Sequence, residues 1–242
     1  MLGNEPPEIL YKNIGTFNGQ AIALRVTNQT VYDPPGPKQT GIKGAFGNIN
    51  QGPGETVQFL FEFVNDDGAP YDGDYTPSEM IPLFHFSFFD LDGHDSEFEL
   101  EELKLLTEID SFELTEPSEI EFLPQNTPQN PSDFPIWKST QPTLAADNPS
   151  DPLNLTDKQK RKSVIFQFSN KNSFEIVFTV GPQDPNWPAD APDNARNFLF
   201  AGVANITITD FDNSTAEATP PPPSPPAFCA GMTSIVSSIN IV

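Results

Sequence analysis

Alternating apolar and polar residues mark much of this chain as β-strand. The clearest segments are rich in Phe and cover residues 57–65, 83–89, 164–168 and 174–180. Successive side chains of a strand point to opposite faces, so each segment can bury one apolar face and turn the other toward water. With further apolar runs, the pattern predicts about ten strands and little helix. The expected fold is all-β: an antiparallel two-sheet β-sandwich, jelly-roll-like, with long Pro-rich loops and an extended C-terminal tail.

Local signals place several of these elements. Residues 9–11 and 20–27 form a predicted strand pair, with turn residues between them. Residues 44–50 are expected as a short edge strand, and residues 170–172 as the turn of a hairpin between two Phe-rich strands. Residues 155–162 are the single expected helix, with Thr156 as N-cap. Its basic cluster is interpreted as a solvated face or a counter-charge to the acidic loops.

The composition changes abruptly after Thr215, which indicates three parts. A β-sandwich domain is expected over residues 8–213, a Pro-rich linker over 214–228 and an apolar segment over 229–242. The run of prolines in the linker predicts an extended polyproline II rod. The last segment is prone to form strands and nearly uncharged, so it would aggregate unless it paired with something. We therefore expect it to add a strand to the sheet of a neighbouring copy.

The charge of the chain restricts its partners. With 34 acidic against 12 basic residues, the formal net charge is -22 and the isoelectric point is about 4.1. Such a surface repels phosphate, so neither nucleic acid nor an anionic membrane is an expected partner. No apolar run reaches the ~20 residues of a membrane-spanning helix, so membrane insertion is not expected. The N-terminus does not have the pattern of a signal peptide, and the one cysteine, Cys229, excludes an intrachain disulfide.

Acidic residues gather where the Phe-rich strands end. Crowded carboxylates repel one another unless a hard cation such as Ca²⁺ joins them. This predicts a calcium site built from Asp90, Asp92 and Asp95, to which Asp66, Asp67, Asp210 and Asp212 could contribute. The alternative is that these residues form turns, cap strands and provide a solvated acidic surface.

One motif would give the chain an enzymatic activity. Glu108, Asp110 and Glu113 fit the E-x-D-x-x-E signature and resemble the catalytic strand of laminarinase-type glycoside hydrolases. The resemblance implies that one glutamate is a nucleophile and the other an acid/base. The usual glycine before the first glutamate is replaced by Thr107, and no tryptophan-lined cleft is evident nearby. The chain is therefore not expected to be an enzyme, and hydrolysis is kept as an alternative.

Two features bear on carbohydrate. Trp137 and Trp187 lie beside prolines in expected loops, where they could stack on sugar rings or, as the favoured interpretation, cover the end of the sandwich. Sequons for N-glycosylation occur at Asn28, Asn154, Asn205 and Asn213. Together with calcium, the tryptophans support a calcium-dependent carbohydrate-binding module as a second hypothesis.

Four segments carry a resemblance to a known group of proteins. Residues 13–20, 88–92, 146–152 and 196–202 resemble secreted β-sandwich domains of marine protist and bacterial surface proteins. The proline run is similar to linkers of algal wall and flagellar-surface glycoproteins. The resemblance implies an extracellular or cell-surface location and a structural or adhesive role. The leading hypothesis is a non-catalytic, calcium-stabilised surface module that assembles through its C-terminal strand.

Overall fold

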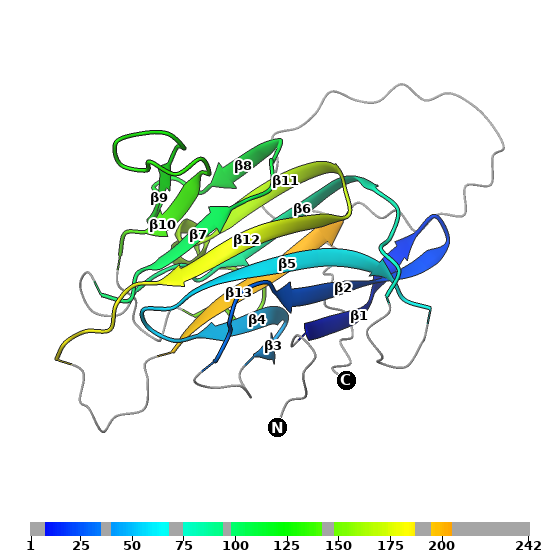
Figure 1. Cartoon of the computed structure of the whole chain (residues 1–242), viewed down its shortest axis with the longest axis horizontal. Helices are drawn as coiled ribbons and strands as arrows, with labels where there is room; N and C mark the ends of the chain where they lie inside the picture. The colour runs from blue at the N-terminus through cyan, green and yellow to red at the C-terminus, as the bar shows by residue number, and fades with distance from the viewer. Residues whose placement is uncertain are drawn as a thin grey trace.

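The computed structural model describes residues 8–34, 40–67, 75–93, 98–141, 148–186 and 195–204. In these ranges thirteen strands form two antiparallel sheets that pack face to face (Figure 1). In spatial order, the seven-stranded sheet contains β1 (Glu8–Phe17), β2 (Gln20–Asn28), β5 (Thr56–Asn65), β12 (Ser173–Val180), β7 (Glu101–Leu105), β10 (Ile136–Ser139) and β9 (Ile120–Leu123). The six-stranded sheet contains β3 (Gly41–Lys43), β4 (Phe46–Gln51), β13 (Arg196–Ala204), β6 (Ile81–Phe89), β11 (Val164–Lys171) and β8 (Ser111–Leu114). The predicted all-β, two-sheet fold is confirmed.

Two local predictions are confirmed in detail. β1 and β2 form a hairpin whose turn residues Asn18 and Gly19 have φ angles of 50° and 78°. Two positive φ angles are the signature of a type I′ turn, which matches the twist of a hairpin. Helix α1 (Asp157–Arg161) begins after Thr156, which exchanges hydrogen bonds with Gln159 in a capping box. It is five residues long, and none of the described residues form a helix that could cross a membrane.

Two connections differ from the predictions. The link at residues 170–172 is not a hairpin, because β11 pairs with β6 and β8 in one sheet while β12 pairs with β5 and β7 in the other. The chain crosses between the sheets here, so the apolar faces of both strands meet across the core, with the rings of Phe168 and Phe174 stacked at 4.8 Å. The strand near residues 44–50 is not at an edge either, because the short β3 pairs with its outer side.

The space between the sheets is filled by phenylalanine. Phe61 lies at the centre, stacked on Phe174 at 4.9 Å and edge-on to Phe86 and Phe200 at 5.4 and 5.2 Å. All four rings are almost completely buried. Phe needs no hydrogen-bond partner in a dry core, and edge-to-face contacts add to the stabilisation from area burial. This core holds the two sheets in fixed positions relative to each other.

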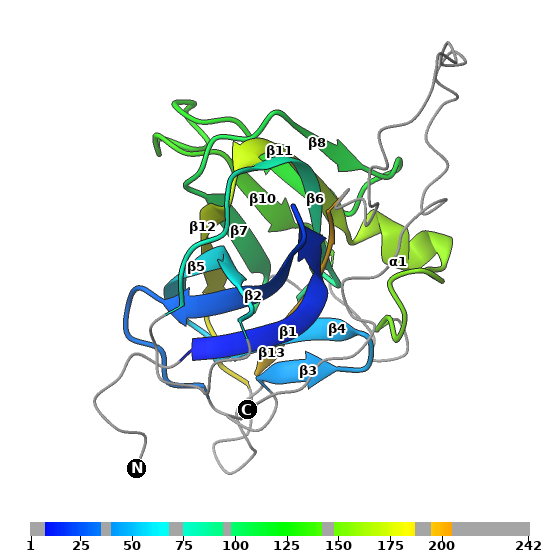
Figure 2. The ribbon, with the colours of Figure 1, turned by 90° about the vertical axis from the view of Figure 1, so that its right-hand side faces the viewer.

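The sandwich has two lateral edges, which Figure 2 shows at the bottom and the top of the view. The tied edge is formed by β1 and β3, where the Tyr11 hydroxyl of one sheet donates to the Gly41 carbonyl of the other at 2.6 Å. The pocket edge is formed by β8 and β9, each four residues long. β10 lies next to β9 and also contributes to this edge.

Candidate functional site

The acids predicted to bind calcium lie at both ends of the sandwich. Asp66 and Asp67 follow β5, whose end lies beside the start of β12. Asp90 and Asp92 follow β6, whose end lies beside the start of β11. Because β11 runs the length of its sheet before β12 begins, these two pairs are at opposite ends. The expectation that Asp66 and Asp67 contribute to the same cluster is therefore wrong.

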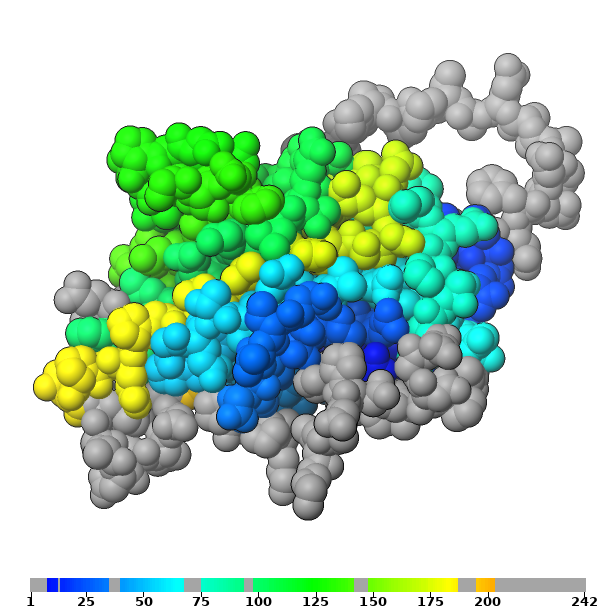
Figure 3. Space-filling view, viewed as in Figure 1, coloured from blue at the N-terminus to red at the C-terminus, as the bar shows by residue number. Residues whose placement is uncertain are grey.

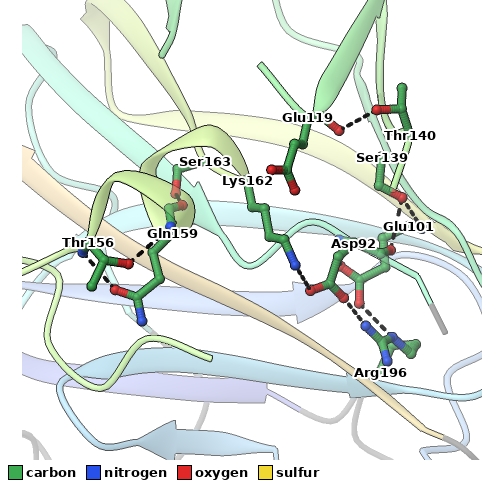
Figure 4. Close-up of polar contacts among 10 residues, drawn as sticks. All are labelled: Asp92, Glu101, Glu119, Ser139, Thr140, Thr156, Gln159, Lys162, Ser163 and Arg196. Atoms are coloured by element: carbon green, nitrogen blue, oxygen red, sulfur yellow. Dashed lines mark hydrogen bonds and ion pairs between the residues drawn. The ribbon is translucent and has the colours of Figure 1, made fainter. Parts of the chain in front are cut away.

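At the β6 end, basic side chains of the protein itself neutralise the acids (Figure 4). Asp92 accepts hydrogen bonds from Lys162 Nζ, at 3.1 Å, and from the Arg196 guanidinium. Arg196 Nε also binds Glu101 Oε1 at 3.0 Å. The side chains of Asp92, Glu101 and Lys162 are each only 1% exposed. Breaking a pair in such a buried ion network leaves an uncompensated charge, so each partner is needed.

The ion network joins elements that are distant in the sequence. Lys162 follows α1, Arg196 begins β13 and Glu101 begins β7, so both sheets and the helix meet here. Ser139 at the end of β10 donates to the Asp92 carbonyl at 2.9 Å and accepts from the Glu101 amide at 3.0 Å. Part of the basic cluster around α1 thus serves as the counter-charge that the sequence suggested. The ion network therefore links the two sheets at one end of the sandwich.

Burial shifts the pKa values of the ionisable groups in and beside this ion network. Asp90 is 7% exposed, has a φ of 62°, and its Oδ1 lacks a hydrogen-bond partner among the described residues. Burial and the charge of Asp92 raise the pKa of Asp90 to about 7, against the lowering effect of Lys43, Lys162 and Arg196. Burial also raises the pKa of Glu101 despite the neighbouring Arg196. For Arg196, burial lowers the pKa, but Glu101 and Asp92 outweigh it and raise the value.

The calcium hypothesis keeps its status as a prediction. In the ranges that the structure describes, no three His, Cys, Asp or Glu side chains are placed to hold a metal ion. Asp95, Asp210 and Asp212 lie outside those ranges. So do the predicted linker, residues 214–228, and the predicted assembly segment, residues 229–242 with Cys229.

A different feature lies at the pocket edge. Between the two sheets at this edge is a cavity of about 440 Å³, and Phe112 of β8, Phe122 of β9 and Trp137 of β10 are among the residues that line it. The rings of Phe112 and Phe122 are 4.5 Å apart, and each is about 5 Å from the indole, at 5.2 and 5.1 Å. In Figure 3 the surface dips between β8 and the lobe formed by the chain around residues 124–135. The other lining residues are Ile109, Asp110, Ser111, Pro124, Gln125 and Pro135.

Short strands and one buried amide build this pocket. Along β8, the exposed Ser111 and Glu113 alternate with Phe112 and Leu114, which turn toward the core. The loop after β9 is held by Asn130, which is 2% exposed. Its Nδ2 donates to the carbonyls of Leu123 at 3.1 Å and of Phe134 at 2.8 Å. A satisfied buried amide fixes a loop well, so the two prolines of the pocket wall have defined positions.

Trp137 has another position than the sequence suggested. It lies in β10 rather than in a loop, its side chain is fully buried, and it packs edge-on to Phe166 at 4.6 Å. Stacking on a sugar requires an exposed ring face, so the prediction that Trp137 is a surface glycan contact is wrong. Its indole N–H is buried and has no acceptor among the described residues. Trp187 lies outside them.

The three carboxylates of the hydrolase motif do not share a cleft. Glu108, Asp110 and Glu113 are all exposed, and only Asp110 lines the pocket. Glu108 and Asp110 precede β8, whereas Glu113 is on its outward face. A retaining glycosidase needs two carboxyl groups that flank one bond from the same site. The described geometry therefore gives the hydrolase alternative no support.

The chain segment that forms β8 and β9 is rich in acids. Between Lys104 and Lys138 the chain has no Lys, Arg or His, but it has seven acids: Glu108, Asp110, Glu113, Glu116, Glu119, Glu121 and Asp133. All but Glu119 are exposed. The sequence did not predict an apolar pocket with the carboxylate residue Asp110 in its lining. The absence of basic residues from this stretch is the signal that could have revealed it.

Two of the four sequons can be placed. Asn154 is exposed in the turn before α1, where a glycan would have space. Asn28 ends β2, and its Nδ2 donates to the Thr30 carbonyl at 2.8 Å. Asn205 and Asn213 lie outside the described residues.

Comparisons with known proteins give remote likenesses. No protein-family model and no curated protein matches the chain. Among solved structures, it is similar to the N-terminal domain of the Streptococcus gordonii adhesin Sgo0707, with 13% identity, a TM-score of 0.44 and coverage of 81% of this chain and 46% of that one. It is also similar to the adhesin domain of PrgB from Enterococcus faecalis bound to DNA, with 12% identity, a TM-score of 0.45 and coverage of 81% and 67%.

A third similar structure is the glucan binding protein C of Streptococcus mutans, with 12% identity, a TM-score of 0.43 and coverage of 80% of this chain and 56% of that one. The chain thus spans about half to two thirds of these solved chains. All three proteins come from bacteria. The expected resemblance to surface proteins of marine protists and bacteria, and that of the proline run to algal linkers, stays a prediction. At these TM-scores the function has to be inferred from the site itself.

Proposed function

We propose that this chain is a non-catalytic binding module of the adhesion type, and that it binds its ligand at the pocket edge. The observation that carries the proposal is the aromatic pocket of about 440 Å³ between β8 and β9. Ligand sites are typically concave, mostly apolar and largely preformed, with a few polar groups at defined positions. The residues that line it include three with aromatic rings, Phe112, Phe122 and Trp137, and one with a carboxylate, Asp110.

The lining favours binding over chemistry. Among the described residues that line the pocket, Asp110 has the one carboxylate, and none is a histidine, lysine or cysteine. General acid–base catalysis needs a second group within reach of the same substrate atom. A preformed apolar pocket beside exposed strand edges instead suits recognition of a partner molecule.

The most direct test obstructs the mouth of the pocket without removing core atoms. Ser111 lines the pocket and is exposed on the outward face of β8, so Ser111→Trp places a bulky indole beside the pocket. The matched control is Gln20→Trp, at an exposed position on the β1–β2 hairpin. Peptide and glycan arrays would be probed with the wild type and both variants. We expect Ser111→Trp to abolish binding that Gln20→Trp retains. Binding that survives Ser111→Trp would place the site elsewhere.

Calcium and self-association form a separate part of the proposal. They are motivated by the acid-rich loops and by the uncharged apolar sequence of residues 229–242. Sedimentation velocity of the intact chain in calcium and then in chelator tests both. Assemblies that form in calcium and dissolve in chelator would support this part. A monomer under both conditions would overturn it and leave the binding module intact.

A further inference from the structure

The inference below rests on the function proposed above and concerns the chemistry of the ligand. We propose that the pocket edge binds an extended basic peptide of a partner protein, with one large apolar side chain inserted in the pocket. The first observation is the size and lining of the pocket. A cavity of about 440 Å³ lined by Phe112, Phe122 and Trp137 has room for a bulky side chain. Such buried anchors carry most of the binding energy in many interfaces.

The second observation is the pair of free strand edges. Among the described residues, β8 pairs only with β11, and β9 pairs only with β10. In the ranges that the structure describes, no further strand pairs with the outer edge of β8 or of β9, although Ser118 Oγ already bonds the Ile120 backbone of β9. An extended peptide can satisfy these backbone groups by adding to either sheet, while its alternate side chains point toward the pocket. A small ring-shaped ligand would use the pocket but not the edges.

The third observation is the charge of the segment that forms β8 and β9. Between Lys104 and Lys138 the sequence has seven acids and no base, and Asp110 lines the pocket. Lys138 of β10 lies opposite Glu121 of β9 and is a base at the same edge. Complementary charge speeds association and rejects partners of the wrong sign. The same field repels an identical edge of a second copy, which prevents edge-to-edge aggregation. It favours a peptide with Lys or Arg on both sides of the anchor. Residues 229–242 contain no charged side chain and are the weaker candidate.

The test uses the intact chain and a matched set of peptides. The probe is acetyl-Lys-Thr-Val-Phe-Val-Thr-Lys-amide, followed by versions with Glu or Gln in place of both Lys, and with Ser in place of Phe. Titrations would be followed by calorimetry at low and high salt. We expect the Lys peptide to bind and to weaken by about tenfold or more at high salt. We expect the Glu version and the Ser version to lose measurable binding.

Variants locate the interaction. Asp110→Asn should weaken the Lys peptide by about three- to fivefold, the usual range for one exposed charge pair. It should leave the Gln version unchanged. Asp33→Asn is the matched control, because Asp33 is exposed and lies outside the acidic stretch. Ser111→Trp should abolish binding of the Lys peptide.

Several outcomes would overturn the inference, and they differ from failure of the proposed function. If the Lys and Gln versions bound equally and independently of salt, the inference that the ligand must be basic would be wrong. The proposal that the chain is a binding module would stand. A glycan that is lost with Ser111→Trp, while no peptide binds, would have the same two consequences. A synthetic peptide of residues 229–242 that binds more tightly than the Lys peptide would make the chain's own tail the occupant. Peptide binding that Ser111→Trp does not change would overturn both.

Discussion

The two lateral edges of the sandwich are closed in different ways. At the tied edge, the buried Tyr11 packs against Phe200 at 5.5 Å, and its hydroxyl crosses between the sheets to Gly41. Nearby, the Tyr32 hydroxyl donates to the Asn50 carbonyl at 2.8 Å. At the pocket edge, ring contacts between Phe112 and Phe122 hold the sheets together. A directional hydrogen bond is lost if its partner moves, whereas a ring contact can be exchanged for contact with a ligand. The difference makes the pocket edge the better surface for binding.

The largest expected effect comes from truncating one aromatic residue at each edge. Tyr11→Ala should lower the free energy of unfolding by about 3–5 kcal/mol, as is usual for a buried aromatic residue. Phe122→Ala should lower it by only about 1–2 kcal/mol, because Phe122 is half-buried and borders an existing cavity. Urea unfolding of both variants measures the difference. Equal losses would show that the pocket edge contributes as much to the free energy of unfolding as the tied edge does.

Alkaline pH should weaken the tied edge selectively. Burial raises the pKa of Tyr11 far above its ordinary value, and burial also raises that of Tyr32, to about 12 despite its hydrogen bond to Thr40. In the unfolded chain both hydroxyls lose their protons near pH 10. Their contribution to stability is therefore complete below pH 10 and is lost as the pH rises toward the folded pKa values.

The pH dependence can be measured by urea unfolding at pH 9, 10 and 11. Tyr11→Phe keeps the ring and removes the titrating group, so its stability should fall less steeply with pH. It should also be less stable than the wild type at pH 8 by about 1–2 kcal/mol, the usual effect of one buried hydrogen bond. Phe122→Ala at the pocket edge is the control, and its profile should parallel that of the wild type. Identical slopes for Tyr11→Phe and the wild type would show that Tyr11 does not carry the effect.

The smallest expected effect concerns charge at the pocket edge. Glu113 is exposed on β8 in a stretch with no basic residue. Glu113→Gln relieves repulsion, so it should leave stability unchanged or raise it by no more than about 0.5 kcal/mol. Thermal unfolding at low and high salt measures this, and any gain should shrink with salt. A clear loss of stability would mean that Glu113 has a structural partner in the folded chain.

Much of the fold could be predicted because alternation reports which side of a strand is buried. Residues 57–65, 83–89 and 174–180 became β5, β6 and β12 almost as expected. Alternation does not report which sheet a strand joins. The link between β11 and β12 was therefore assigned to a hairpin, although it crosses between the sheets.

The candidate site was harder to predict, because its residues are close together in the structure but far apart in the sequence. Trp137 has a proline two positions before it and lies in a strand of four residues, too short for alternation to show. Asp92 and Glu101 form ion pairs with Lys162 and Arg196, which lie far along the chain. Sequence spacing could suggest a cation for the acids, but it could not pair them with these side chains.

The position of β13 has a consequence for how the protein is made. It is the last of the described strands along the chain, yet it lies between β4 and β6 in the middle of its sheet. During synthesis, β4 and β6 cannot be joined in their native places until residues 196–204 have left the ribosome. Arg196, which completes the ion network, arrives with the same strand. Long-range pairing of this kind slows folding, so the sheet closes only after nearly all of the described chain has been translated.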